Sequence, residues 1–282
     1  MTSQEALDMT PRARFLMCEP RHFAVSYDIN PWMSAHIGAA SNTLARQQWD
    51  ALATAMAAAG ADLVVMENQP AELPDLVFTA NAACIHGSRA YLSCFAKPQR
   101  TPEQALYQAA LQAVGLKTDT RFIDHHIPFE GAGDALQIEG GPLVTGWGFR
   151  SNPKAARILA ECEKELAIFP AQLIDPRFYH LDTCFCPLTD GSVIWYPGAF
   201  SDATRHDIHI ALELRGSIEV TETEARDFCC NAVEVGNTLF ANHWSDRLIS
   251  LLAARGYDAL SVDLSEFMKA GGAAKCLTLR LD

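Results

Sequence analysis

The C-terminal stretch EFMKAGGAAKCLTLRLD, residues 266–282, places a cysteine between a turn of small residues and a short apolar strand. Its last part, GGAAKCLTLRLD, shares a predicted layout with four earlier segments: a small or polar turn, a strand, a second turn and a second strand. The four are VFTANAACIHGSRAYLS (77–93), FEGAGDALQIEGGPLVTG (129–146), HLDTCFCPLTDGSVIWYPG (180–198) and CNAVEVGNTLFANH (230–243). Because a recurring layout is the sign of a repeat architecture, the chain is predicted to contain five related units.

One polar or nucleophilic residue lies near the start of the first strand in each segment. These anchor residues are Asn81, Glu130, His180, Asn231 and Cys276, at intervals of 49, 50, 51 and 45 residues. Five units of roughly 50–56 residues would fill the chain, and a ring of such units leaves few strand edges exposed. Equivalent positions in a ring converge on its axis, so Glu130, His180 and Cys276 are predicted to meet there. The alternative is an ordinary α/β protein in which such layouts recur without a ring.

Helical patterns alternate with these strand-like segments. Apolar residues at spacings of three and four, with Gly and Pro boundary signals, predict four amphipathic helices. The helical stretches are residues 42–60, 101–115, 152–170 and 243–256. Residues 62–66, DLVVM, are predicted as a buried strand. Strands that alternate with helices indicate an α/β chain, and no linker or low-complexity block divides it, so we expect one domain over residues 1–282.

The composition limits the class of protein. The chain has 282 residues, of which 49% are hydrophobic and 20% charged, an ordinary globular mixture. Its formal charge of −12 argues against a nucleic-acid surface. No stretch reaches the roughly 18 apolar residues of a membrane span, and the start MTSQEALDMT lacks the features of a signal peptide. The nine cysteines have no framework spacing and are expected to be reduced thiols of a cytoplasmic protein.

The residue types at the anchors suit an attack on a guanidinium group. A cysteine becomes a good nucleophile when a neighbour favours its thiolate, and a histidine can protonate a leaving amine and then activate water. Carboxylates such as Glu130 and Asp182 accept paired N–H bonds from a planar guanidinium. Asp182 follows His180 by two residues, and it is predicted to lie on the same side of a strand. Taken singly, Cys276 suits a core position, His180 a structural histidine and Glu130 an exposed loop acid. Their common position in the repeat favours a functional site.

Short motifs at and near these positions carry a family resemblance. The motifs are MCEPRHFAVSYDINPWM (17–33), FTANAA (78–83), FEGAGDAL (129–136), GWGFRS (146–151), YHLDTC (179–184) and GGAAKCLTL (271–279). They resemble the guanidino-group-modifying, or amidinotransferase, superfamily, and the first looks like the start of its arginine dihydrolase and amidinotransferase-like branch. The resemblance implies the pentein fold, an α/β five-bladed β/α propeller with pseudo-five-fold symmetry.

The resemblance also implies a role for each matching residue. Cys276 corresponds to the nucleophile that forms a covalent amidino-thioether, and His180 to the acid/base histidine. Glu130 corresponds to the carboxylate that holds the guanidinium and supports the histidine, and Asp182 to a second carboxylate. Further substrate contacts are implied for Arg150 and Arg100, through the α-carboxylate, and for Asn30 and Asn81. Arg100 is the looser match, because SCFAKPQR (93–100) departs from the usual pattern.

Asn81 discriminates between the most similar activities. Arginine deiminases usually carry aspartate here, whereas dihydrolase-like members carry asparagine within FTANA. Because an amide donates as well as accepts hydrogen bonds, it can hold a neutral ureido group for a second attack. We therefore expect an arginine dihydrolase that converts arginine to ornithine, two ammonia and carbon dioxide. Its partner is a small-molecule substrate, no cofactor is expected, and a homo-oligomer is left open.

Other interpretations stay open. Dimethylarginine dimethylaminohydrolase, arginine deiminase and amidinotransferase use the same machinery on related substrates or acceptors. A metal-binding protein is the interpretation outside this chemistry, since Cys184 and Cys186 share a strand face, and HH (125–126) and HDIH (206–209) add imidazoles. No CxxC pair accompanies them, so no metal site is expected. The GAG turn at 131–133 lacks the GxGxxG pattern of a dinucleotide loop.

Overall fold

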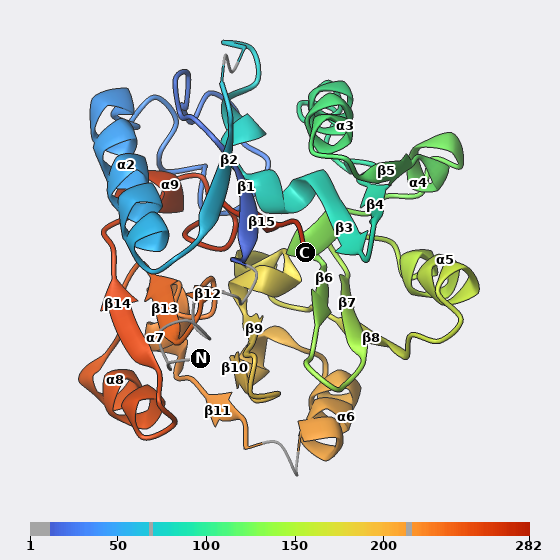
Figure 1. Cartoon of the computed structure of the whole chain (residues 1–282), viewed down its shortest axis with the longest axis vertical. Helices are drawn as coiled ribbons and strands as arrows, with labels where there is room; N and C mark the ends of the chain where they lie inside the picture. The colour runs from blue at the N-terminus through green and yellow to red at the C-terminus, as the bar shows by residue number, and fades with distance from the viewer. Residues whose placement is uncertain (1–11, 68–69, 213–215) are drawn as a thin grey trace, which may run out of the picture.

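Five three-stranded β-sheets surround a common centre in the computed structural model, which describes residues 12–67, 70–212 and 216–282 (Figure 1). In each sheet the middle strand pairs antiparallel with one neighbour and parallel with the other. The sheets are β15 (Leu279–Arg280), β1 (Arg14–Cys18) and β2 (Asp62–Met66); β3 (Ala83–His86), β4 (Arg89–Leu92) and β5 (Lys117–Asp119); β6 (Ala135–Gln137), β7 (Leu143–Trp147) and β8 (Ile168–Gln172); β9 (Phe185–Pro187), β10 (Val193–Trp195) and β11 (Ile218–Glu219); β12 (Val233–Val235), β13 (Thr238–Ala241) and β14 (Asp258–Ser261).

A helix connects the two parallel strands of each sheet and lies at the periphery (Figure 1). These helices are α2 (Asn42–Ala58), α3 (Glu103–Ala113), α5 (Lys154–Cys162), α6 (Asp202–Leu212) and α8 (Asp246–Ala253). The hydroxyl groups of Ser41 and Ser245 cap α2 and α8 by accepting backbone N–H bonds, as expected of polar residues at a helix start. The predicted helices over residues 42–60, 101–115 and 243–256 are thus confirmed, with ends trimmed by a few residues.

Short helices and 3-10 turns fill the remaining connections. They are α4 (Arg121–Asp124), α7 (Glu222–Arg226), α9 (Ser265–Met268), η1 (Pro74–Val77), η2 (Thr79–Ala82), η3 (Gly131–Gly133), η4 (Pro176–Phe178), η5 (Leu181–Thr183) and η6 (Pro197–Ala199). Three anchor residues lie in or directly before these turns. Asn81 lies within η2, Glu130 directly precedes η3, and His180 directly precedes η5. These anchors therefore lie in tight turns shortly before the strands, as their predicted position near the strand starts requires. His180 and Asp182, however, do not share a strand face, because Asp182 is inside η5.

The first and last strands of the described chain combine in one sheet. β15 pairs antiparallel with β1, with Leu279 opposite Leu16, and both side chains are fully buried. The C-terminal segment was predicted to form two strands, but it supplies only β15. Its partner strand, β1, comes from the other end of the described chain. The fifth sheet is therefore built from segments far apart in the sequence.

Two further predictions need correction. β2 is the outer strand of its sheet and is partly exposed, with Val65 at 38%, so residues 62–66 do not form a buried strand. The predicted helix over residues 152–170 ends at Cys162, and Ile168–Gln172 forms β8 instead. Pro170 lacks an N–H and cannot continue a helix, and the apolar residues before it pair with β7.

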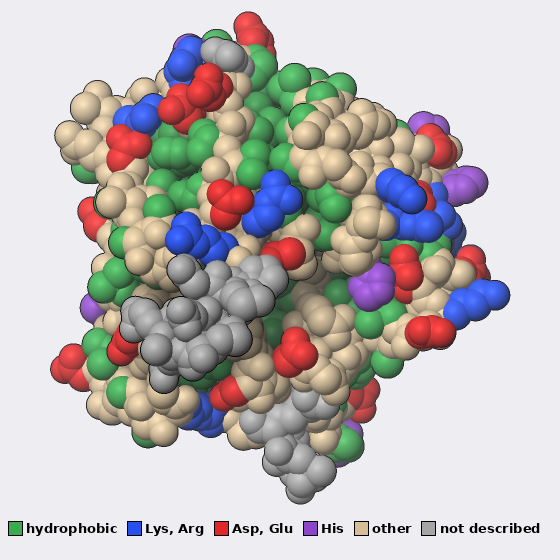
Figure 2. Space-filling model, in the orientation of Figure 1, with side chains coloured by type: hydrophobic (Ala, Val, Ile, Leu, Met, Phe, Trp, Pro, Cys, Tyr) green, Lys and Arg blue, Asp and Glu red, His purple; other side chains and the backbone are tan. Residues whose placement is uncertain are grey.

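A cavity of about 370 Å³ lies between the five sheets. Every one of the five sheets contributes to its wall, through residues that include Cys84, Leu136, Cys186, Val233 and Leu279. In the view of Figure 2 the face is hollowed near its middle, and Lys and Arg side chains are mixed with Asp and Glu. No helix in the described ranges is long and apolar enough to cross a membrane.

Candidate active site

The predicted site residues converge on a second, smaller pocket at the centre of the molecule. Six of the eight line it: Asn30, Asn81, Arg100, Arg150, His180 and Cys276. The other two lie directly behind, where Glu130 bonds to His180 and Asp182 bonds to Cys276. The pocket has a volume of about 10 Å³, room for roughly one water molecule. The segments around it must therefore separate before an amino acid can enter.

Cys276 is a buried thiol held by two side chains. Its Sγ donates to Asp182 Oδ2 at 3.3 Å and accepts from Asn231 Nδ2 at 3.1 Å. The Asn231 oxygen accepts the backbone N–H groups of Cys276 and Ala273, at 3.2 and 2.9 Å. Burial and the neighbouring Asp182 carboxylate raise the pKa of the Cys276 thiol well above its usual range. In the empty pocket the sulfur is therefore protonated, and a thiolate requires an added positive charge.

Asp182 is placed to receive that positive charge. Burial raises the pKa of its carboxyl to about 7, while Lys275 and the bond to Cys276 act in the opposite direction. Its Oδ1 atom is buried and has no hydrogen-bond partner among the described residues. A buried carboxylate oxygen without a donor is costly, so this atom is suited to accept an N–H from a ligand. A guanidinium bound there would lie against the Cys276 sulfur.

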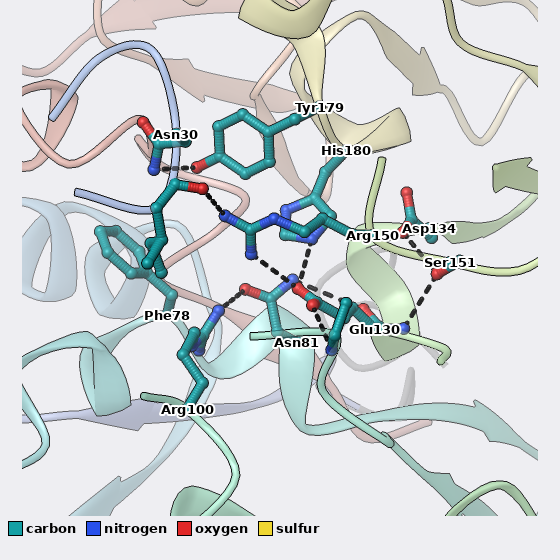
Figure 3. A network of polar contacts seen from close by, with 12 residues as sticks. Asn30, Phe78, Asn81, Arg100, Glu130, Asp134, Arg150, Ser151, Tyr179 and His180 are labelled. Carbon is teal, nitrogen blue, oxygen red and sulfur yellow. Dashed lines mark hydrogen bonds and ion pairs between the residues drawn. The ribbon is translucent and has the colours of Figure 1, made fainter. Parts of the chain in front are cut away.

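His180, Glu130 and Arg150 form one buried chain of charges. His180 Nε2 lies 2.7 Å from Glu130 Oε2, which also accepts from Arg150 Nη1 at 3.1 Å (Figure 3). Although burial alone would raise it, Arg150 and His180 together hold the pKa of Glu130 down to about 2. Glu130 is therefore ionised at neutral pH. Because Nε2 faces this carboxylate, Nδ1 is the His180 nitrogen left to exchange protons with a substrate.

A buried Asp134–Ser151 pair fixes the turns that carry these two residues. Ser151 Oγ accepts the Glu130 N–H at 3.0 Å and donates to Asp134 Oδ2 at 2.6 Å (Figure 3). Asp134 Oδ1 accepts the N–H of Leu181, the residue after His180, at 3.0 Å. The pair thus ties η3 to η5. Gly131 completes the first turn with a φ of +57°, where a Cβ would lie 2.7 Å from the Ala83 backbone.

The two arginines differ in how much of their donor capacity is used. Arg150 Nη2 donates to the Ile29 carbonyl at 3.0 Å, and its guanidinium lies 4.6 Å from the Tyr179 ring centre. Together with the Glu130 bond, these contacts use two of its five N–H donors. Arg100 donates to Glu103, Asn81 and the Asp75 carbonyl, which uses four of five. Arg150 is therefore the better equipped to bind a carboxylate.

Asn30 and Asn81 are both held by hydrogen bonds in the pocket wall. Asn30 Nδ2 donates to the Ala270 carbonyl at 3.0 Å and to Tyr179 Oη at 3.3 Å. Asn81 Oδ1 accepts from Arg100 at 2.7 Å, and its Nδ2 lies 3.4 Å from the Glu130 carbonyl. The structure therefore brings Asn30, Asn81, Arg100 and Arg150 to one pocket, with Asp182 directly behind it.

Comparison with known proteins identifies the family to which this geometry belongs. The sequence matches the family described as N,N dimethylarginine dimethylhydrolase, eukaryotic, over residues 29–281. The chain belongs to this family. A member from Mycobacterium tuberculosis, N(G),N(G)-dimethylarginine dimethylaminohydrolase, is 34% identical over 96% of this chain and 87% of its own length.

Proteins named for arginine dihydrolase activity are also similar to this member of the dimethylarginine dimethylhydrolase family. AgrE of Nostoc sp. (strain PCC 7120), a bifunctional arginine dihydrolase/ornithine cyclodeaminase, is 42% identical over 97% of this chain. The match spans only 38% of AgrE. The solved N-terminal domain of ArgZ, an arginine dihydrolase from Cyanobacteria bound to substrate, is 38% identical. It superposes with a TM-score of 0.90 and covers 95% of this chain and 98% of the ArgZ chain.

Several residues of this dimethylarginine dimethylhydrolase family site were not assigned a role from the sequence. Asn231 was found as a repeat anchor, and its interval pointed to the centre, but its bond to Cys276 was not foreseen. Asp75 lines the pocket, is buried and has an unpartnered Oδ1 atom, and burial raises its pKa. It stands six residues before Asn81, outside the repeated layout, so no spacing signal marked it. Ser151 and Asp134 lie within two of the motifs but could not be paired without coordinates.

The residues considered for a metal site lie apart from this pocket. Cys184 and Cys186 are buried in the apolar core, whereas His125, His126 and the imidazoles of HDIH on α6 are exposed. Within the described ranges, no group of three or more His, Cys, Asp or Glu side chains is arranged to hold a metal ion. All nine cysteines are unpaired thiols.

Proposed function

We propose that the chain is a cysteine-dependent arginine dihydrolase, which converts arginine to ornithine, two ammonia and carbon dioxide. One observation carries the proposal: in a buried pocket, the Cys276 thiol bonds to Asp182, whose Oδ1 atom has no partner among the described residues, and His180 lies beside it with Glu130 behind. The 42% identity to AgrE and the similarity to substrate-bound ArgZ support the choice of substrate.

The first step forms a covalent bond to the substrate carbon. The guanidinium of arginine pairs with Asp182, and its positive charge favours the Cys276 thiolate. The sulfur attacks the central guanidinium carbon, a C–S bond forms, and one C–N bond breaks. His180, protonated beside ionised Glu130, gives its Nδ1 proton to the departing nitrogen, which leaves as ammonia. The product of this step is an amidino-thioether on Cys276.

The second step releases the sulfur. With Nδ1 now unprotonated, His180 takes a proton from a water molecule, and the resulting hydroxide attacks the amidino carbon. The C–S bond breaks, the departing Cys276 sulfur takes up the proton that the new hydroxyl group gives up, and a neutral ureido group remains on the side chain. The bound product at this point is citrulline.

The third step distinguishes a dihydrolase from a deiminase. The Nδ2 group of Asn81 points toward the Glu130 carbonyl. It can donate a hydrogen bond to the oxygen of the ureido group and so hold it in place. A second attack by Cys276 displaces the second ammonia, and water then cleaves the thioester-like intermediate to a carbamate. The carbamate loses carbon dioxide and leaves ornithine, so two waters are consumed for each arginine.

The remaining pocket residues suit the amino-acid end of the substrate. Arg150 keeps three N–H donors for an α-carboxylate, and Arg100 keeps one. The unpartnered Oδ1 of Asp75 is matched to an α-ammonium group. Asn30 links this wall to the Ala270 carbonyl.

The same proposal extends to architecture and location. Five sheets of one topology support a five-bladed β/α propeller with pseudo-five-fold symmetry, formed by a single domain. Nine unpaired thiols support a reducing compartment, the cytoplasm.

Dimethylarginine dimethylaminohydrolase is the second candidate, because the family match and the 34% identical relative from Mycobacterium tuberculosis carry that name. Product analysis separates the two. Purified protein is incubated with arginine and with asymmetric dimethylarginine, and citrulline, ornithine, ammonia and dimethylamine are measured, with Cys276→Ala as the inactive control. Ornithine with two ammonia per arginine supports the proposal. Citrulline alone contradicts it, and dimethylamine as the preferred product supports the second candidate. Asn81→Asp should shift the products of arginine toward citrulline.

A further inference from the structure

The Asn81 amide is held in a single orientation by Arg100. A guanidinium has N–H donors and no acceptor, so the amide atom that faces it at 2.7 Å must be the oxygen. The NH₂ group then points the other way, toward the Glu130 carbonyl at 3.4 Å, as Figure 3 shows. A Cβ at position 133 would collide with Nδ2, so Gly133 leaves the space that this orientation needs. Asn81 is therefore fixed with its NH₂ group on the Glu130 side of the pocket.

Glu103 in turn holds Arg100. The Glu103 carboxylate, at the first residue of α3, accepts from Arg100 Nε at 3.0 Å and from Nη2 at 2.7 Å. This side-on pair is almost completely buried, at 3% and 0% exposure of the two side chains. Arg100 also stacks 4.5 Å from the centre of the Phe95 ring. A planar guanidinium with two bonds to one carboxylate and one aromatic contact has no freedom to rotate.

We propose that Glu103 is a positioning residue that acts through Arg100 to keep the Asn81 N–H turned toward the reaction centre, and so lets the second hydrolysis follow the first. This inference rests on the proposed dihydrolase function. Glu103 does not line the catalytic pocket, and it affects the chemistry only through the chain Glu103, Arg100 and Asn81.

The orientation matters most for the neutral intermediate. Arginine is held by its charge, through Asp182, whatever the direction of the Asn81 amide. Citrulline has lost that charge, and its ureido oxygen needs a donor. If the Asn81 amide turns over, its oxygen faces the Glu130 carbonyl and offers the ureido oxygen no N–H. Loss of the Glu103–Arg100 ion pair should therefore slow the second hydrolysis, of citrulline, more than the first, of arginine.

The test uses the substitution Glu103→Gln, which keeps the size of the side chain but removes its charge. Single turnovers of labelled arginine are followed at a pH above the pKa of Glu103, which burial raises to about 7. Ammonia from the first step, citrulline and ornithine are measured. We expect the ratio of ornithine to citrulline to fall by about tenfold, the effect of one lost hydrogen bond, while the first ammonia is released with a smaller change in rate.

A matched control excludes a general loss of stability. Glu224 forms the same side-on pair with Arg247, through Nε and Nη2, in a different sheet region remote from the pocket. Glu224→Gln should leave the product ratio unchanged. If Glu103→Gln fails to fold, the double substitution Arg100→Met with Glu103→Met removes the buried pair without leaving a lone charge. It should lower the ratio in the same direction.

The outcomes separate this inference from the function on which it rests. If the wild-type protein makes no ornithine, both the proposed function and this inference are wrong. Wild-type protein that makes ornithine, with an unchanged product ratio in a folded Glu103 variant, overturns the inference alone. An equal fall in both steps also overturns it, because a structural role without positioning predicts that result.

Discussion

The Asn231 side-chain amide donates to the Cys276 sulfur across 3.1 Å, while its oxygen accepts the Cys276 backbone N–H across 3.2 Å. The Asn231 amide thus bonds to Cys276 at two atoms, the sulfur and the backbone nitrogen. Because backbone N–H groups fix the oxygen, the NH₂ group must face the sulfur. This bond acts against burial and lowers the pKa of the Cys276 thiol.

Substitution of Asn231 by alanine should weaken catalysis through the thiolate. A hydrogen bond to a charged group contributes about 1.5–3 kcal/mol, so kcat/KM should fall roughly 10- to 100-fold. The rate of alkylation of Cys276 by iodoacetamide, measured against pH, should report a higher thiol pKa. Asn237→Ala is the control, since Asn237 is exposed and its side chain bonds to Asp258 at the surface. An unchanged thiol pKa in Asn231→Ala would contradict this role.

The ionisation of Asp182 should set the acid limb of the pH profile. Its carboxyl has a pKa raised to about 7, so it is protonated below that pH and negative above it. Binding of a guanidinium needs the negative form, and kcat/KM reports the free enzyme. The value of kcat/KM for arginine should therefore fall as pH decreases through about 7.

Substitutions that remove the charge of Lys275 should change the midpoint pH of this acid limb of the kcat/KM profile. Its ammonium lowers the pKa of Asp182, so Lys275→Met should shift the midpoint of the limb to higher pH. Lys275→Arg keeps the positive charge and should leave the midpoint in place. A midpoint that is the same in both variants would show that Asp182 does not control the limb.

Removal of His180 should separate the first covalent step from its hydrolysis. His180→Ala lacks the base that activates water, so arginine should leave an amidino adduct on Cys276 that intact-protein mass spectrometry detects. Cys276→Ala should form no adduct and should lose activity by about 10³-fold or more. His206→Ala, in the exposed face of α6, should behave as wild type. An adduct mapped to another cysteine would rule out Cys276 as the nucleophile.

The repeated spacing of polar anchors was sufficient to predict where the site assembles. The structure brings Asn81, His180 and Cys276 to one pocket, with Glu130 directly behind His180. The roles of Arg150, Arg100 and Asn30 came only from the family resemblance. Their contacts with Glu130, Glu103 and Ala270 form between residues of the segments that connect the strands, and no periodic pattern encodes such contacts.

Two parts of the structure were beyond sequence patterns for physical reasons. β15 is only two residues long and exists because β1, at the far end of the chain, pairs with it. Alternation over two residues carries no signal. Asp75 was also missed, because a single acid in a 3-10 turn is ordinarily a solvated residue, and only the fold buries it.

The pairing of β15 with β1 should contribute strongly to global stability. Leu279 faces Leu16 across the two strands, and both are buried, at 1% and 0% exposure. Leu279→Ala leaves a cavity at the junction of the two chain ends, and we expect the free energy of unfolding to fall by about 2–4 kcal/mol. Leu260→Ala on β14 is the matched control, because Leu260 is 44% exposed and should change stability by about 0.5 kcal/mol or less. Denaturation by urea measures both. Equal effects of the two substitutions would mean that the pairing of β15 with β1 contributes no more to stability than an exposed strand position does.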